Sequence, residues 1–270
     1  MMKINSFNPV ARAYSKSVAP YRFSQFLTLV YELKFRGSEK VLDIGTGPGE
    51  LSMQIAAQLT NGGYLKGIDL SGNMVRLARK TAASHKQSNV HFETGDALNL
   101  NFDDDTFDVV VSSNAFPWVP DRIKFLHEVY RVLKPGGQFG LVTLSNNCYK
   151  EFGSAFKKAA INSPHLFPQG KPFEIMGAKL HSLIELSKLV SRTGFTVTKD
   201  FQLSTEEPIQ AVDYINRVNA IVNENYLDHL GSNGKRLKAR KLIVDALRGR
   251  NGSLKVTESS IFIIAQKPAA

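Results

Sequence analysis

Lys40-Val41-Leu42-Asp43-Ile44-Gly45-Thr46-Gly47-Pro48-Gly49 is the stretch from which the fold prediction starts. The apolar run 41–44 is typical of a buried strand, and residues 50–59 carry apolar side chains at helical spacing. Three glycines separate the two segments, and glycine lets the backbone pass close to a ligand because it has no Cβ. The order of strand, glycine turn and helix predicts a nucleotide-like ligand at this junction.

The spacing of the glycines separates two classes of ligand. A dinucleotide fingerprint has glycines at its first, third and sixth places. Here they occupy the first, third and fifth places, and Glu50 stands at the sixth. The pattern Asp43-x-Gly45-x-Gly47-x-Gly49 resembles motif I of the class I S-adenosylmethionine (SAM) methyltransferases. On its own, such a cluster is equally a plain turn before a helix.

Composition and length predict a globular protein with a full core. The chain has 270 residues, of which 43% are hydrophobic and 21% charged. Its single Cys148 excludes a disulfide framework and a cysteine-based metal site, and no metal is expected. No leader-like apolar segment and no run long enough to cross a membrane is evident, so we expect a cytoplasmic protein without membrane insertion.

The net charge of +10 is concentrated in the stretch 235–250. Such a stretch binds nucleic acid, an anionic membrane, an acidic protein or an anionic substrate in different proteins. The bland alternative is a solvated helix face. We favour that interpretation, and do not expect nucleic-acid binding, because no aromatic residues are interleaved for base stacking.

Residues 1–36 are predicted to form an N-terminal helical arm, whose second helix covers 21–33 and ends at Gly37. The arm is either a cover for the sheet edge or a lid over the ligand. In the second case Tyr14 or Tyr21 faces the site and contributes to the substrate pocket.

A second strand is predicted at 64–68, followed by Asp69 and a helix from Gly72. Asp69 lies about twenty residues beyond the glycine turn, where open α/β sheets place the acid that binds ribose hydroxyls. The alternative is a helix cap, because Asp and Ser are both good N-caps. In the ribose interpretation, Leu70 and Met74 lie against the adenine.

Three further elements complete the pattern. Strands are predicted at 90–94 and 107–112, and a Leu-Lys-Pro-Gly-Gly turn at 133–137 precedes another strand. Taken in order, these elements resemble the UbiE-type, small-molecule branch of the class I SAM methyltransferases over about residues 36–145. The resemblance implies a Rossmann-like, seven-stranded, mostly parallel α/β sheet with an antiparallel strand near one edge.

The resemblance also implies a cofactor site. Gly45, Thr46, Gly47 and Gly49 would hold the methionine end of SAM, which becomes S-adenosylhomocysteine (SAH). Asp43 of the same motif would also be a cofactor-binding residue. Asp96 and Ala97 would bind the adenine, and Ser113 would lie near the donor methyl.

The sequence departs from the family after the fourth strand. Many relatives read His-Trp-Val there, whereas this chain has Pro117-Trp118-Val119. Phe116 and Trp118 either line the acceptor pocket or pack in the core. No catalytic residue is assigned; His165, His181 and His229 are candidate bases, although a lone histidine is more often structural.

The second half is predicted to supply specificity. We expect residues 37–145 to form the SAM-binding core, and 146–270 to complete the same single domain with cap inserts at about 146–182 and 207–252. The first insert is rich in aromatic residues and prolines, which predicts a segment with many loops. A helix at 180–191, a strand at 196–203, two helices within 208–250 and a closing strand at 261–265 follow.

These observations predict an enzyme that methylates an O, N or C atom of a small-molecule substrate. Three alternatives stay open: an RNA or protein methyltransferase that uses the stretch 235–250, a nicotinamide-dependent oxidoreductase, and a SAM-binding protein without catalysis. The acceptor and the oligomeric state are not predicted.

Overall fold

The computed structural model describes residues 22–167, 178–222, 227, 230–247 and 253–269. The predicted arm residues Tyr14 and Tyr21, and the candidate base His229, lie outside these ranges.

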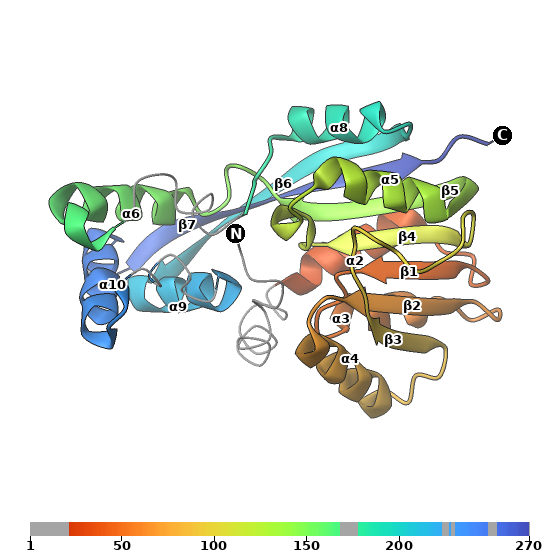
Figure 1. Cartoon of the computed structure of the whole chain (residues 1–270), viewed down its shortest axis with the longest axis horizontal. Helices are drawn as coiled ribbons and strands as arrows, with labels where there is room; N and C mark the ends of the chain where they lie inside the picture. Colours follow the sequence, from red (N-terminus) through yellow and green to blue (C-terminus); the bar gives the residue numbers. More distant parts are fainter. Residues whose placement is uncertain (1–21, 168–177, 223–226, 228–229, 248–252, 270) are drawn as a thin grey trace.

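Seven strands form one sheet in the order β3-β2-β1-β4-β5-β7-β6 (Figure 1). β7 pairs antiparallel with both β5 and β6, and the pairs among β3, β2, β1, β4 and β5 are parallel. This arrangement confirms the predicted fold class. The strands are β1 (Lys40–Ile44), β2 (Tyr64–Asp69), β3 (Val90–Thr94), β4 (Phe107–Ser113), β5 (Leu133–Leu144), β6 (Thr196–Gln210) and β7 (Ser253–Gln266).

Helices cover both faces of the sheet. One face packs against α2 (Phe23–Leu33), α3 (Glu50–Ala56) and α4 (Gly72–Ser84), and the other against α5 (Arg122–Val132) and α8 (Leu183–Arg192). The strands read as continuous apolar runs because both faces are covered. In β4, for example, Val109 and Val111 face the α2 side and Val110 faces the α5 side, all at most 4% exposed.

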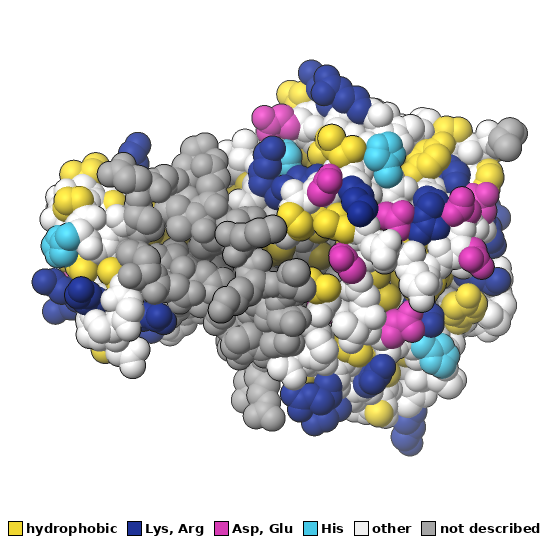
Figure 2. All heavy atoms as spheres, in the orientation of Figure 1, with side chains coloured by type: hydrophobic (Ala, Val, Ile, Leu, Met, Phe, Trp, Pro, Cys, Tyr) yellow, Lys and Arg dark blue, Asp and Glu magenta, His cyan; other side chains and the backbone are white. Residues whose placement is uncertain are grey.

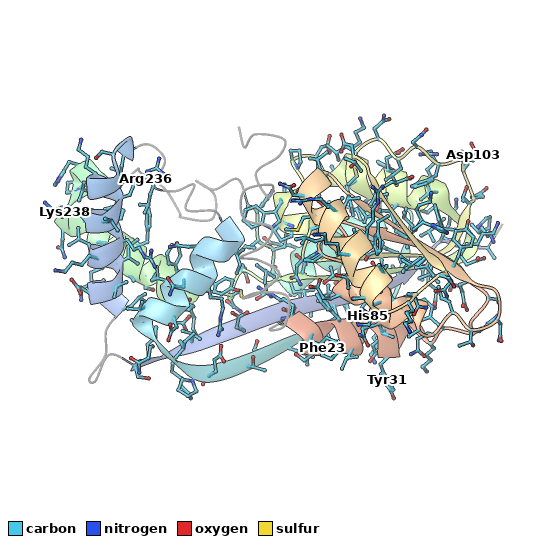
Figure 3. All side chains as sticks on the ribbon, turned by 90° about the horizontal axis from the view of Figure 1, so that it is seen from below. Phe23, Tyr31, His85, Asp103, Arg236 and Lys238 are labelled. Carbon is cyan, nitrogen blue, oxygen red and sulfur yellow. The ribbon has the colours of Figure 1, made fainter. Side chains whose placement is uncertain are left out.

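Helix α2 is the described part of the predicted arm. Its inner face buries Phe26, Leu29 and Leu33, while Phe23 and Tyr31 lie on its outer face (Figure 3). The helix ends at Leu33, the end of the predicted range 21–33, but the left-handed residue that follows it is Lys34 and not the predicted Gly37.

A lobe extends the molecule beyond the sheet. The outer halves of β6 and β7 continue as a two-stranded ribbon, from Leu203 paired with Ser260 to Gln210 paired with Ser253. α6 (Lys150–Asn162), α9 (Ala211–Val222) and α10 (Asn233–Leu247) lie at the far end of this ribbon (Figure 1). These three helices, called the lobe below, share an apolar core that includes Phe152, Phe156 and Ile243.

Several predicted boundaries were wrong. Residues 150–162 form helix α6, not a loop, because Phe152, Phe156 and Ala159 recur at helical spacing and are buried. β6 and β7 are much longer than 196–203 and 261–265 because they pair with each other beyond the sheet. The sequence Pro135-Gly136-Gly137 lies within β5, where the pairing with β4 shifts register and Gly136 has a φ of +78°.

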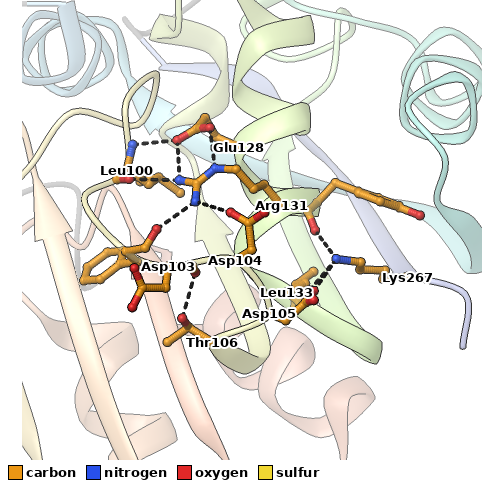
Figure 4. A network of polar contacts seen from close by, with 11 residues as sticks. Leu100, Asp103, Asp104, Asp105, Thr106, Glu128, Arg131, Leu133 and Lys267 are labelled. Atoms are coloured by element: carbon orange, nitrogen blue, oxygen red, sulfur yellow. Dashed lines mark hydrogen bonds and ion pairs between the residues drawn. The ribbon is translucent and has the colours of Figure 1, made fainter. Parts of the chain in front are cut away.

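The loop 103–106 is held by two cations (Figure 4). Arg131 on α5 donates to Asp104 Oδ1 at 2.8 Å and to the carbonyl oxygens of Leu100 and Phe102. Lys267 Nζ donates to Asp105 Oδ1 at 2.6 Å. Among the described residues, no group of three His, Cys, Asp or Glu side chains is placed to bind a metal ion.

Candidate functional site

The glycine turn between β1 and α3 has the backbone conformation that requires glycine. Gly45, Gly47 and Gly49 have φ values of +76°, +56° and +92°. A Cβ at Gly45 would lie 2.3 Å from the Cβ of Ala115, and a Cβ at Gly49 would lie 3.1 Å from that of Ala78 on α4. No atom of the described residues, apart from its chain neighbours, lies within 4 Å of a Cβ at Gly47. Gly45 and Gly49 thus allow close packing, while Gly47 borders open space.

Asp69 at the end of β2 fixes the turn. Its Oδ2 accepts the backbone N–H of Gly47 at 3.0 Å, and its Oδ1 accepts that of Ser71 at 2.8 Å. The carbonyl oxygen of Ile68 also accepts the N–H groups of Gly45 and Thr46. Burial raises the pKa of Asp69, and the two backbone hydrogen bonds oppose that rise. A carboxylate has about four lone-pair positions, so each oxygen can still accept from a ligand hydroxyl.

A buried hydrogen-bond chain supports the turn from below. Ser52 Oγ donates to Asp43 Oδ2 at 2.6 Å, and Thr46 Oγ1 lies 2.7 Å from Ser52 Oγ. Asp43 is 1% exposed, and burial raises the pKa of its carboxyl to about 6 although both hydroxyl groups act against the rise. Within the described chain, Asp43 Oδ1 has no hydrogen-bond partner. A buried unpaired oxygen of this kind calls for a donor from water or a ligand.

A pocket opens over the turn. Five of the predicted cofactor residues, namely Asp43, Gly45, Thr46, Gly47 and Ser113, line it together with Phe26, Pro48, Glu50 and Leu51. Glu50 and Phe26 are not among the residues predicted for the site from the sequence. Burial raises the pKa of Glu50 to about 7, so its charge changes near neutral pH. Glu50 directly follows Gly49, and this position next to the glycine motif was the only indication in the sequence that Glu50 belongs to the site.

The predicted adenine side lies at the same edge of the sheet. Gly95 N–H donates to the carbonyl oxygen of Asp69, which brings the ends of β2 and β3 together. Asp96 is exposed, and its Oδ1 accepts the N–H of Leu98 at 2.9 Å. Ala97 is partly buried, Leu70 is 41% exposed, and Met74 is buried. The roles of these residues toward adenine stay predictions.

Phe116 and Trp118 lie in the short helix η2 (Phe116–Trp118), directly after β4. Phe116 is fully buried, and its ring packs against the rings of Phe125 and His181 at 5.5 and 6.1 Å. Trp118 is partly buried against the core of the lobe. Phe116 and Trp118 therefore pack as core residues, which was one of the two interpretations of the sequence. Contact of either side chain with an acceptor stays a prediction.

The candidate bases differ in their surroundings. His165 lies exposed in η3 (Pro164–Leu166), whereas His181 is buried beside Phe116. Burial, with the nearby charges of Arg122 and Lys179, lowers the pKa of His181. Its imidazole is therefore neutral at neutral pH, which is the state a proton acceptor requires.

A polar chain connects the end of β4 with the lobe. Asn114, at a φ of +57°, donates from Nδ2 to Ser113 Oγ and to Gln25 Oε1. Arg22 Nη1 donates to the same Gln25 oxygen at 3.3 Å, and Arg22 Nη2 donates to Tyr149 Oη at 2.7 Å. Helix α2 thus lines the pocket through Phe26, and its N-cap Arg22 contacts Tyr149, the residue that precedes lobe helix α6.

The comparisons with known proteins agree with this geometry. Residues 41–137 match the family model described as a methyltransferase domain. Phosphoethanolamine N-methyltransferase 2 of Caenorhabditis elegans is 30% identical over 179 residues, which are 66% of this chain and 37% of that protein. The ubiquinone/menaquinone biosynthesis C-methyltransferase UbiE of Geotalea daltonii is 35% identical over 117 residues, 43% of this chain and 50% of that protein.

Among solved structures, the YcgJ protein of Bacillus subtilis has a TM-score of 0.63 at 22% identity, covering 92% of this chain and 99% of that one. At this identity the likeness shows the fold alone. The chain spans half or less of the two curated relatives, so their whole activities are not carried over from these matches.

Proposed function

Residues 41–137 form a domain of the class I SAM-dependent methyltransferase family, and from this membership we propose that the chain transfers the methyl group of SAM to a small-molecule acceptor. The glycine turn clamped by Asp69 carries the proposal, since Gly45, Thr46, Gly47, Ser113 and the carboxylates around them form one pocket. That cradle fits SAM because the cofactor needs close backbone approach and carries positive charge. SAM supplies an already activated methyl donor, so the protein mainly orients the reactants and excludes water.

Each end of the cofactor has a proposed set of residues. Gly45, Thr46 and Gly47 would contact the methionine end, where the Glu50 carboxylate lies in the same pocket. Asp69 would accept from the ribose, and Asp96 with Ala97 would contact the adenine. Gly49 is not among the pocket-lining residues, and its proposed contribution is the close packing of the turn on α4.

The acceptor class remains broad. The names of two relatives specify phosphoethanolamine N-methylation and quinone C-methylation, both reactions of small molecules. We propose a small, partly apolar acceptor bound between the end of β4, η2 and the lobe, with the choice among O, N and C open. We further propose that the enzyme works in the cytoplasm; no helix of the described part is long and apolar enough to cross a membrane.

Calorimetric titration of the purified chain with SAM tests the cofactor, and NADH is the control. We expect SAM to bind and NADH not to bind, because the sixth motif position is Glu50 where a dinucleotide site has glycine. Binding of NADH without SAM would establish the oxidoreductase alternative. After SAM binding is seen, SAH release across a panel of acceptors separates an enzyme from a SAM-binding protein without turnover.

A further inference from the structure

The lobe differs in charge from the rest of the molecule. Its three helices contain nine Lys or Arg residues and three Asp or Glu residues. Figure 2 shows Lys and Arg side chains together with hydrophobic ones on the described surface of the lobe, and no carboxylate among them in that view. Arg236 and Lys238 of α10 lie at this end in Figure 3.

Five lysines of the lobe are exposed and have no ion-pair partner in the part of the chain that the structure describes. Within the described ranges, no carboxylate lies within ion-pair distance of five exposed lysines, namely Lys157, Lys158, Lys235, Lys238 and Lys241. Lysines on the strands behave differently, since Lys66, Lys134 and Lys199 pair with Glu93, Asp108 and Glu32. Among the described residues, the charges of these five lysines are therefore not neutralised by an ion pair.

Two of the three lobe helices, α6 and α10, also expose an aliphatic side chain among their lysines. On α6, Ile161 is 72% exposed and lies one turn beyond Lys157 and Lys158. On α10, Leu237 is 65% exposed, next to Lys238 and one turn before Lys241. Residues three and four apart share a helix face, so Ile161 lies on one face with both Lys157 and Lys158. Leu237 shares its face with Lys241, while Lys238, the next residue, projects to the side of that face. α6 and α10 pack against each other within one core.

We propose that this face of α6 and α10 docks on an anionic lipid surface. Clustered lysines are attracted to acidic headgroups, and exposed aliphatic side chains gain free energy when they enter the headgroup region. RNA is the other polyanion to consider, but Ile161 and Leu237 offer no ring for base stacking. The solvated helix face predicted from sequence accounts for the lysines and leaves the two aliphatic residues unexplained. The proposal concerns surface docking, without insertion of a helix across the bilayer.

Sedimentation of the full chain with phosphatidylcholine vesicles, with and without phosphatidylglycerol, tests the proposal. We expect binding only to the anionic vesicles, weakening as salt is added because exposed charges are screened. The double variant Leu237→Ser/Lys241→Glu should weaken this binding by at least about tenfold, since one lysine near an anionic surface contributes about fivefold. Both side chains are exposed, so circular dichroism and Tm should not change.

Helix α8 offers a matched control. Ile184 is 67% exposed and Lys188 follows one turn later, but Glu185 lies between them in the sequence and is also exposed. Ile184→Ser/Lys188→Glu makes the same chemical change and should leave vesicle binding within about twofold.

Three results would overturn the proposal: no binding to anionic vesicles at low salt, equal loss in the two double variants, or lobe-dependent binding of a single-stranded RNA oligonucleotide without vesicle binding. None of these measurements depends on SAM or on methyl transfer.

Discussion

Arg22 Nη2 donates a hydrogen bond of 2.7 Å to Tyr149 Oη, across 127 positions of sequence, and both side chains are buried. The same guanidinium lies 3.8 Å from Glu258 Oε2 on β7. Burial raises the pKa of Glu258, and the charge of Arg22 is the largest influence that opposes the rise. One cation at the start of α2 thus joins the arm, the lobe and the outer ribbon.

Removing this cation should destabilise the protein strongly. We expect Arg22→Ala to lower the free energy of unfolding by about 3–5 kcal/mol, because it leaves Glu258 buried beside fewer cations. The loss should be larger at high pH, where the carboxyl must ionise, than at low pH. Urea unfolding at two pH values measures both effects. Lys199→Ala, which breaks an exposed pair with Glu32, is the control and should cost at most about 1 kcal/mol. A loss for Arg22→Ala that is small or independent of pH would contradict this role.

Two glycines of the same turn should respond differently to alanine. Gly45→Ala meets Ala115 at 2.3 Å and should destabilise the fold, whereas Gly47→Ala meets no atom and should cost only about 1–2 kcal/mol for its left-handed backbone. A methyl group at Gly47 would point into the space proposed for SAM, so the cofactor should bind at least about tenfold more weakly. Urea unfolding and SAM calorimetry on both variants separate these effects. Wild-type SAM affinity in a folded Gly47→Ala protein would exclude the proposed position of the cofactor.

The part of the site that sequence predicted is local in the chain. The motif from Asp43 to Gly49 determines its own turn, because three left-handed positions in five residues permit few other conformations. Asp69 could be placed beside it because parallel strands bring their carboxyl ends to one edge. Glu50 went unassigned because its burial comes from the packing around the turn, which no local pattern reveals.

The strands that lead to the lobe were predicted too short, because their outer halves are stabilised by pairing with each other and not by a local sequence pattern. The outer half of β6 is largely exposed, and Pro208 and consecutive glutamates there are poor strand signals. Its strand conformation comes from pairing with β7, across an interval that contains α9 and α10. The cluster of Arg22, Tyr149 and Glu258 likewise depends on distant segments that sequence spacing does not bring together.

The affinity for SAM should rise with pH through neutrality. Glu50 has a pKa of about 7 in the ligand-free pocket, and its ionised form attracts the positive charge of SAM. If binding requires that form, affinity should increase about tenfold between about pH 6 and about pH 8. Calorimetry on the wild type and on Glu50→Gln isolates the contribution, because the variant should lose most of the slope. The same slope in both proteins would assign the titration to another group.

Asp43 should make the fold less stable as pH rises. Its pKa is raised on folding to about 6, so the folded state binds the proton more tightly than the unfolded chain. This contribution is fully present below about pH 4 and is lost as pH rises through about 6, a change of about 3 kcal/mol. Asp43→Asn should remove that part of the pH dependence in urea unfolding, while Asp103→Asn, at an exposed carboxylate, should keep it. An unchanged profile in Asp43→Asn would show that folding does not raise the pKa of Asp43.

Asp69 combines two roles that its variants should separate. Asp69→Ala removes the acceptor for the Gly47 and Ser71 N–H groups, so the turn should loosen and SAM affinity should be lost together with about 1–3 kcal/mol of stability. Asp69→Asn keeps one acceptor oxygen and should retain more stability, yet it should bind SAM weakly if the carboxylate accepts from two ribose hydroxyls. Calorimetry with SAM, beside urea unfolding, distinguishes the cases. Wild-type affinity in Asp69→Asn would show that Asp69 only holds the turn through its hydrogen bonds to Gly47 and Ser71. The ribose would then bind to other residues at the end of β2.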